Sequence, residues 1–291
     1  MTEQKIIVVF CHSRAKLLKQ CLASICKAYG FNEWKLVVVH QKGYPDVEQV
    51  LERYKNRINT LVSLEPNFNF ALGNINYNRI LGTKIGFEVL RADYVLGVEE
   101  DNLISVDALK FIEFSYNEYK KFRSFRGINL GSVEYDKSIT EEGYSLLRFG
   151  LHGSAGVLTK KTWIDIKKRK LFEFDLTNSN FAWDAKIEFY LKTGFMVTPN
   201  LSRNLDLGYG GTFSPASKMD PYFQGIQKSW CSQKNKLDID YKRIQIHHSW
   251  RADSVGFKRI KSLIYFLRSC SFLSTLSNYI GLTKLIKKMF I

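Results

Sequence analysis

Three consecutive acidic residues, Glu99, Glu100 and Asp101, directly follow an apolar run that ends at Val98. Carboxylates so close together repel one another, so a bound cation or a basic partner has to compensate for their charge. Carboxylate oxygens suit Mg²⁺ and Mn²⁺, and both ions also bridge well to a diphosphate. The triplet therefore predicts a divalent-cation site; the competing interpretation is a solvated loop or a helix cap at the end of a strand.

The elements that must position this triplet alternate along the chain. Apolar runs without polar alternation fit strands covered on both faces, and they span residues 5–11, 36–40, 60–64 and 94–98. Helices are predicted over 17–29, 46–54, 79–90 and 108–119, with Asp46 and Asp107 as caps and an Asn-rich loop over 67–78. This pattern predicts a doubly wound α/β sheet. Ligands of such sheets bind at the carboxyl ends of the strands, which is where the triplet lies.

The composition limits the class of protein. Hydrophobic residues make up 45% of the 291 residues, which is enough for a sizeable core and excludes disorder for most of the chain. Lys and Arg number 43 against 28 acidic residues, and the net charge of +15 favours an anionic partner. The chain has five Cys, which is an odd number, and no CxxC pair. This argues against a disulfide framework or a zinc knuckle and fits a protein of a reducing compartment.

Five segments occur in an order that is typical of one enzyme family. They are Val8–Arg14, Val39–Gly43, Val98–Asp101 with Asp107, Gly150–Gly156 with Trp163, and Trp183–Asp184 with Pro199 and a Ser202–Gly211 block. Together they resemble the GT-A glycosyltransferases over residues 5–215, most of all the N-acetylglucosaminyltransferase I branch and more loosely the family-2 bacterial enzymes. The resemblance implies a GT-A-type, Rossmann-like mixed sheet that is flanked by helices and binds a nucleotide-sugar. The chain departs from the family at Glu100, where the motif has Asp, and at Gln41, where the family often has Asp.

The resemblance also implies roles for individual residues. Asp101 would hold Mn²⁺ or Mg²⁺ on the diphosphate of the donor, with Glu99 and Glu100 near its ribose and sugar. Asp184 would be the general base that deprotonates the acceptor, which inverts the anomeric carbon. Asp at this position also fits a helix cap, and this interpretation stays open. His247 would be a metal or diphosphate ligand, or a structural histidine.

Further candidates for donor binding are basic or polar side chains: Arg14, Gln41, Arg79, Lys84, Thr212 and Ser214. The first two would meet the nucleotide, with Gln41 at the nucleobase. Arg79 and Lys84 would reach the base or the phosphates, or they form a solvated basic helix face. The last two belong to the Gly-rich stretch 208–214, which suits a lid over the donor or a plain loop.

The two ends of the chain differ in character. The N-terminus shows no charged leader and no anchor, so we expect a cytoplasmic protein. Residues 254–291 carry seven basic residues, no acidic residue and an apolar stripe at helical spacing. We therefore expect a catalytic domain over 1–250 and a basic amphipathic segment over 251–291 that binds the anionic inner face of the plasma membrane. The alternative is a core helix with a solvated basic face.

Together these features predict an inverting, metal-dependent hexosyl- or N-acetylhexosaminyltransferase whose expected donor is a UDP-sugar. The expected acceptor is a glycan or a lipid-linked precursor of a bacterial surface polysaccharide. One alternative is a nucleotidyltransferase that makes sugar nucleotides, although Cys11–Arg14 lacks the glycines of that class. The other is a non-catalytic nucleic-acid-binding protein, but no helix-turn-helix, RNA-recognition or zinc signature supports it, so we expect no nucleic acid partner.

Overall fold

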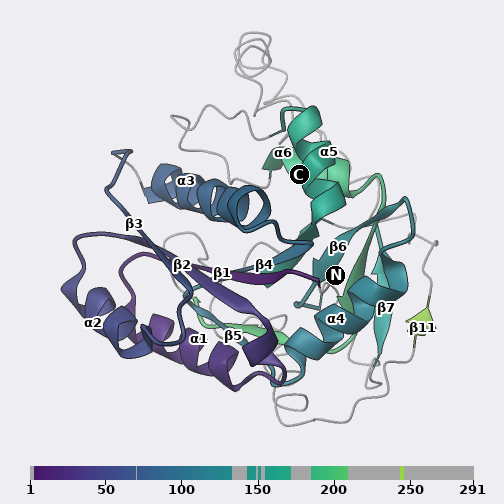
Figure 1. Cartoon of the computed structure of the whole chain (residues 1–291). Helices are drawn as coiled ribbons and strands as arrows, with labels where there is room; N and C mark the ends of the chain where they lie inside the picture. The colour runs from purple at the N-terminus through teal and green to yellow at the C-terminus, as the bar shows by residue number, and fades with distance from the viewer. Residues whose placement is uncertain are drawn as a thin grey trace, which may run out of the picture.

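The computed structural model describes residues 3–69, 71–132, 143–148, 150–151, 155–171, 185–208 and 243–245. Its main feature is a nine-stranded sheet with the order β11-β7-β9-β6-β8-β4-β1-β2-β3 (Figure 1). The predicted division into a domain over 1–250 and a segment over 251–291 cannot be followed in the structure, because the second part lies outside the described residues.

Four parallel strands form the half of the sheet that comes first in the chain. They are β1 (Lys5–Cys11), β2 (Lys35–Gln41), β3 (Thr60–Leu64) and β4 (Tyr94–Glu99). β1 lies between β2 and β4, and β3 pairs with β2. All but the first residue of β1 and of β2 are buried, as expected for strands with helices on both faces. The four predicted strands are thus confirmed, and their carboxyl ends meet at one edge.

The remaining strands make the sheet mixed. They are β6 (Phe125–Asn129), β7 (Tyr144–Leu147), β8 (Ala155–Thr159), β9 (Phe195–Pro199) and β11 (Arg243–Gln245). β8 runs antiparallel to both β4 and β6, whereas β9 runs parallel to β6. The sheet is therefore of the mixed type that the sequence predicts.

Helices cover both faces of the sheet (Figure 1). One layer contains α1 (Ala15–Lys27), α2 (Pro45–Tyr54) and α4 (Ala108–Tyr119), with the short 3₁₀ helix η1 (Phe31–Glu33) beside them. The other layer contains α3 (Ala71–Lys84), α5 (Lys160–Lys168) and α6 (Ala185–Leu191), and α3 continues as the π-helical turn η2 (Ile85–Val89). Each layer packs on its own apolar cluster, since neighbouring residues of a strand point to opposite faces.

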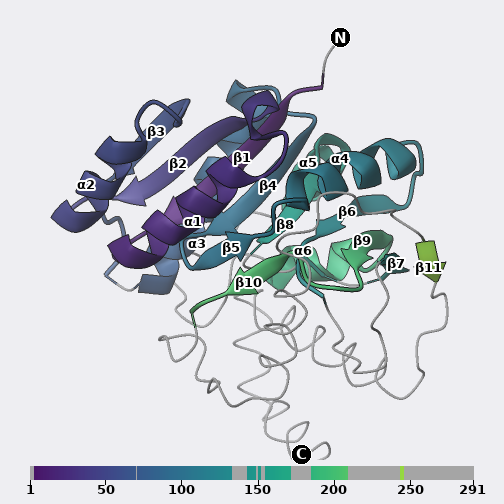
Figure 2. The same ribbon diagram turned by 90° about the horizontal axis from the view of Figure 1, so that it is seen from below.

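A separate two-stranded ribbon lies beside the sheet (Figure 2). It consists of β5 (Asn102–Ile104), which directly follows the acidic triplet, and β10 (Asn204–Asp206), which pairs with it in antiparallel register. This pairing brings a segment a hundred residues away to the end of β4.

Two local predictions are wrong. The Asn-rich segment 67–78 is not a loop throughout, because α3 begins at Ala71. Its residue Asn74 accepts hydrogen bonds from the backbone N–H groups of Asn67 and Phe68, so the amide secures the preceding turn to the helix. Asp46 is not the cap of α2: the helix begins at Pro45, and Asp46 lies in the first turn, where the helix dipole favours a carboxylate.

Candidate functional site

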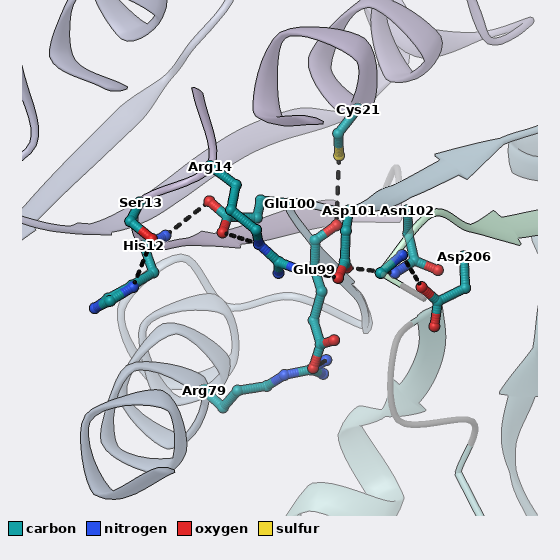
Figure 3. Close-up of polar contacts among 11 residues, drawn as sticks. His12, Ser13, Arg14, Cys21, Arg79, Glu99, Glu100, Asp101, Asn102 and Asp206 are labelled. Atoms are coloured by element: carbon teal, nitrogen blue, oxygen red, sulfur yellow. Dashed lines mark hydrogen bonds and ion pairs between the residues drawn. The ribbon is translucent and has the colours of Figure 1, made fainter. Parts of the chain in front are cut away.

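The acidic triplet lies where predicted, at the carboxyl edge of the parallel strands. β4 ends at Glu99, and Glu100 and Asp101 form the turn before β5 (Figure 3). Two arginines compensate for the three charges. Arg79 Nη2 lies 2.5 Å from Glu99 Oε1, and Arg14 bridges the other two acids, with 2.8 Å from its Nε to Glu100 Oε1 and 2.7 Å from its Nη1 to Asp101 Oδ2. The site thus contains the basic partners that the triplet requires.

Glu100 fixes the first strand and its loop to the site. Its side chain is 2% exposed and also accepts a hydrogen bond from the backbone N–H of His12 at 2.8 Å. The Glu100 N–H donates to the carbonyl of Phe10. Arg14 directly precedes α1 and keeps 41% of its side chain exposed, so it presents a guanidinium to solvent beside two carboxylates.

Arg79 contacts the acidic triplet through Glu99. It belongs to α3, is only 2% exposed, and its guanidinium carbon lies 4.8 Å from the centre of the Phe10 ring. This position ties its charge to Glu99, so Arg79 positions that carboxylate. Lys84 is not brought to the site: it is exposed in the last turn of α3, and five residues of helix rotate its side chain roughly 140° from that of Arg79.

Gln41 is the last residue of β2 and lies two strands away from the triplet at the same edge. Its side chain is 5% exposed, and its Oε1 atom has no hydrogen-bond partner among the described residues. A buried acceptor without a partner is costly unless a ligand or water satisfies it. The position predicted to meet the nucleobase therefore carries an acceptor that a base could use.

Sequence reasoning missed one acidic residue of the site. Asp206 ends β10 opposite Asn102, and the N–H of the next residue, Leu207, donates to the carbonyl oxygen of Asp101 at 2.8 Å. Burial, followed by the charge of Asp101, raises the pKa of Asp206 to about 6. The local sequence shows only that Asp206 is an acid between apolar and amide side chains. It does not show that Asp206 lies beside Asp101.

Gly208 borders both carboxylates. Its N–H donates to Asp206 Oδ1 at 2.7 Å. A Cβ atom at this position would lie 2.3 Å from Asp101 Oδ2 and 3.0 Å from Asp206 Oδ1. A side chain here would clash with Asp101, so glycine allows the backbone to pass close to both carboxylates.

A buried ion pair holds the ribbon in place. Arg203 Nε lies 2.8 Å from Asp107 Oδ2, and the two side chains are 1% and 2% exposed. The Arg203 guanidinium also lies 4.6 Å from the centre of the Phe111 ring. Asp107 was expected to cap α4; it occupies the N-cap position, but its side chain makes no capping hydrogen bond and instead accepts from Ser105 Oγ. Pairing with Arg203 has replaced the cap.

The donor set fits a divalent cation that is shared with a phosphate group. Among the described residues there is no group of three or more His, Cys, Asp or Glu that could hold a metal by themselves. Asp101 and Asp206 supply two carboxylates, and both lie close to the backbone of Gly208. Mg²⁺ in nucleotide enzymes is commonly bound by one or two carboxylates, with phosphate oxygens and water completing its octahedron.

Several predicted residues lie outside the described part of the chain: Asp184, Thr212, Ser214 and His247. Their roles stay predictions, although α6 begins at Ala185, directly after the proposed base. The helices that the structure describes include none with the length and apolar character needed to cross a membrane. The basic segment 251–291 is not among them.

Comparison with known proteins supports the fold. No family model and no curated protein matches the sequence. S. aureus TarS, residues 1–349, matches with a TM-score of 0.50 and 13% identity over 94% of this chain and 83% of TarS. The same protein in complex with UDP-GlcNAc matches with a TM-score of 0.50 and 15% identity, over 93% and 80%.

A mannosyltransferase from Pyrobaculum calidifontis, PcManGT, in complex with GDP-Man and Mn²⁺, shows a lower TM-score of 0.44 with 14% identity, over 68% of this chain and 55% of that one. Likeness at such identities concerns the fold alone. The predicted GT-A-like mixed α/β fold is therefore confirmed.

Proposed function

We propose that this protein is a GT-A glycosyltransferase that moves a sugar from a nucleotide-sugar to an acceptor. The observation that carries the proposal is the site at the carboxyl edge, where the carboxylates of Asp101 and Asp206 both lie close to Gly208 and the partly exposed side chain of Arg14 contacts Asp101. Two carboxylates and a cationic side chain are the groups that a metal-bound diphosphate requires. The likeness to TarS in complex with UDP-GlcNAc supports a UDP-sugar as the donor.

The residues of the site at the carboxyl edge each have a role in this proposal. Gln41 offers its unpartnered Oε1 to the nucleobase, and Arg14 meets the phosphates while Nε keeps its contact with Glu100. Glu99 faces the ribose and donor sugar from the end of β4, where Arg79 holds it. A divalent cation, Mn²⁺ or Mg²⁺, bound by Asp101 would neutralise the charge that develops on the leaving diphosphate.

The acceptor half of the proposal depends on residues beyond those described. Asp184 is proposed as the base that takes the proton of the acceptor hydroxyl, with inversion at the anomeric carbon. Thr212 and Ser214 are proposed to cover the phosphates and His247 to join the metal or diphosphate. We propose a hexosyl- or N-acetylhexosaminyltransferase that acts on a glycan or lipid-linked precursor of a bacterial surface polysaccharide, with segment 251–291 holding it on the anionic inner membrane face.

A donor screen tests the proposal. UDP-, GDP- and dTDP-sugars are added with Mn²⁺ to the full chain, and thermal shift and release of nucleoside diphosphate are measured. At least one donor should raise the melting temperature and be slowly hydrolysed. Asp101→Ala should lose that hydrolysis by about 100-fold or more, because the leaving group is no longer stabilised, whereas the exposed control Asp46→Ala should retain it.

Other outcomes would favour the other classes. Formation of a sugar nucleotide and pyrophosphate from a nucleoside triphosphate and a sugar 1-phosphate would identify a nucleotidyltransferase. If no donor shifts the melting temperature and a nucleic acid does, the chain is a binding protein and the proposal is wrong.

A further inference from the structure

The outer face of α5 combines positive charge with an exposed apolar side chain. Residues 160–170 hold six basic residues and one acid, and Ile164 in their middle is 42% exposed. Residues three and four positions away on a helix are direct neighbours. At Ile164 all four of these positions are exposed lysines, which we call the lysine ring: Lys160, Lys161, Lys167 and Lys168.

Acidic residues compensate for little of this charge. Asp165, the acid of the segment, is half-buried and accepts a hydrogen bond from the hydroxyl of Tyr190 at 2.7 Å. Glu88 pairs with one member of the ring, Lys167, at 2.7 Å. The other three lysines of the ring form no ion pair with the described residues. The face of α5 therefore keeps most of its positive charge.

Helix stability does not explain where the lysines lie. Lys160 and Lys161 belong to the first turn of α5, and that turn holds no acid. The helix dipole disfavours positive charge at this end of a helix and favours it only at the other end. These two lysines thus work against the helix, which indicates that they serve a partner.

A second apolar side chain extends the same surface. Phe122 follows the end of α4 and is 53% exposed, and its carbonyl oxygen accepts a hydrogen bond from Lys161 Nζ at 3.3 Å. The residues on either side of it, Lys121 and Arg123, are both exposed. Lys161 therefore connects two exposed apolar residues, Ile164 and Phe122, that each have basic neighbours.

This surface is separate from the donor site. α5 packs on β8 and β6 (Figure 1). β8 runs antiparallel to β4 and brings Thr159, the residue before α5, beside Tyr94 at the start of β4. Phe122 precedes β6, which is also antiparallel to β8, so it lies at the same edge. α5 thus begins at the amino edge of the strands, whereas the acidic triplet lies at their carboxyl edge.

From this arrangement we infer that the outer face of α5 and the turn at Phe122 form a contact surface for an anionic lipid membrane. The lysine ring attracts the head groups, while Ile164 and Phe122 enter the boundary between head groups and acyl chains. Lysine side chains are long enough to keep their ammonium groups at the head groups while the residue between them inserts. A nucleic acid would satisfy the lysines through its phosphates but offers no apolar phase to Ile164.

The inference concerns the folded part of the chain. It adds a contact to the one proposed for segment 251–291, and it depends neither on that segment nor on the proposed transfer reaction.

Binding of the full chain to vesicles tests it. Phosphatidylcholine vesicles with and without phosphatidylglycerol are titrated, and flotation measures the bound fraction. Lys161→Gln combined with Lys168→Gln should weaken binding to the anionic vesicles about 30-fold, at about fivefold for each charge. The control, Lys19→Gln with Lys27→Gln, removes the same charge from exposed positions of α1. It should weaken binding by less than about threefold, because charges far from the contact are screened. Circular dichroism checks that each variant is folded.

A second measurement reports insertion at the residue itself. Ile164→Trp places an indole inside the lysine ring, and Leu61→Trp places one at an exposed position of β3, the terminal strand of the sheet. Brominated lipids quench a tryptophan that reaches the acyl boundary. Anionic vesicles of brominated phosphatidylglycerol should therefore quench Ile164→Trp more strongly than Leu61→Trp, since the native tryptophans are the same in both variants.

Equal binding of the two double variants, or equal quenching of the two tryptophan variants, would overturn the inference. It also fails if the α5 variant binds vesicles normally and loses affinity for nucleic acid, because the surface then serves another partner. The donor screen is decided separately: the α5 variant should show the wild-type thermal shift with a nucleotide-sugar, whether or not it binds vesicles.

Discussion

The buried pair of Arg203 and Asp107 gives the most direct test of how the ribbon is held. Replacing Arg203 by Met keeps the apolar length of the side chain but leaves the Asp107 carboxylate without this guanidinium, at 2% exposure. Removing one partner of a buried ion pair costs about 3–5 kcal/mol, because the other charge stays buried. The hydrogen bond from Ser105 Oγ still reaches Asp107, so we expect a loss near the lower limit, about 3 kcal/mol.

A double-mutant cycle isolates the pair from its surroundings. Asp107→Asn should also destabilise, since it leaves the buried guanidinium over Phe111 without its counter-charge. The double variant leaves neither charge behind, and replacing both members of a buried pair is often nearly neutral. It should therefore be no less stable than either single variant, with a coupling free energy of about 2 kcal/mol or more.

Urea denaturation of the wild type and the three variants, followed by tryptophan fluorescence, measures these free energies of unfolding. The slope with urea must stay constant for the cycle to be valid. Strictly additive effects, or single variants that lose less than about 1 kcal/mol, would show that the pair does not hold the ribbon as described.

Two further predictions follow from particular contacts. The pKa of Asp206 is about 6 in the native state against an ordinary 3.8, so the native state holds the proton more tightly than the unfolded state. With EDTA present to remove metal ions, the free energy of unfolding should therefore fall as the pH rises from about 4 to about 6. Asp206→Asn should therefore be more stable than the wild type by up to about 3 kcal/mol at pH 7 and by little at pH 4; an equal gain at both pH values in thermal unfolding would contradict this. Gly82→Ala should lower the free energy of unfolding measured in urea by about 1–3 kcal/mol, although Ala is the better helix former. The reason is that its Cβ would lie 2.7–2.9 Å from side-chain atoms of Phe10, Val8 and Val39. A stabilised variant would refute that packing.

The first half of the fold could be predicted because its signals are local. The strands β1, β2 and β4 are continuous apolar runs, since helices cover both of their faces, and the helices between them repeat their apolar residues every three or four positions. The exception is α3, whose buried Asn and Gly residues are poor helix formers. There Asn74 secures the preceding turn, and Gly82 permits close packing on the sheet. The first contact is made with residues six and seven positions earlier and the second with strands of the sheet, and helix propensity shows neither.

The candidate site also contains residues that the local sequence predicts and residues that it does not. The acidic triplet and Arg14 were predictable, because they directly follow adjacent parallel strands. Asp206 and the partner of Asp107 were not, since Arg203 and Asp107 lie 96 positions apart and meet only through the pairing of β10 with β5. The local signal even misled: Asp before a helix favours a cap, but a buried arginine attracts the carboxylate more strongly than the helix N-terminus does.

The arginines at this edge explain why a site with so many acids can be rigid before a ligand arrives. Arg79 and Arg203 are almost completely buried and pair with Glu99 and Asp107, so the fold fixes these two carboxylates. Arg14 is the substantially exposed one of the three, and it bridges Glu100 and Asp101. A ligand that reaches this edge would therefore meet Arg14, while Glu99 and Asp107 keep their buried arginines. Because fixed charges need little rearrangement when a new charge develops beside them, this division suits a site where a diphosphate leaves.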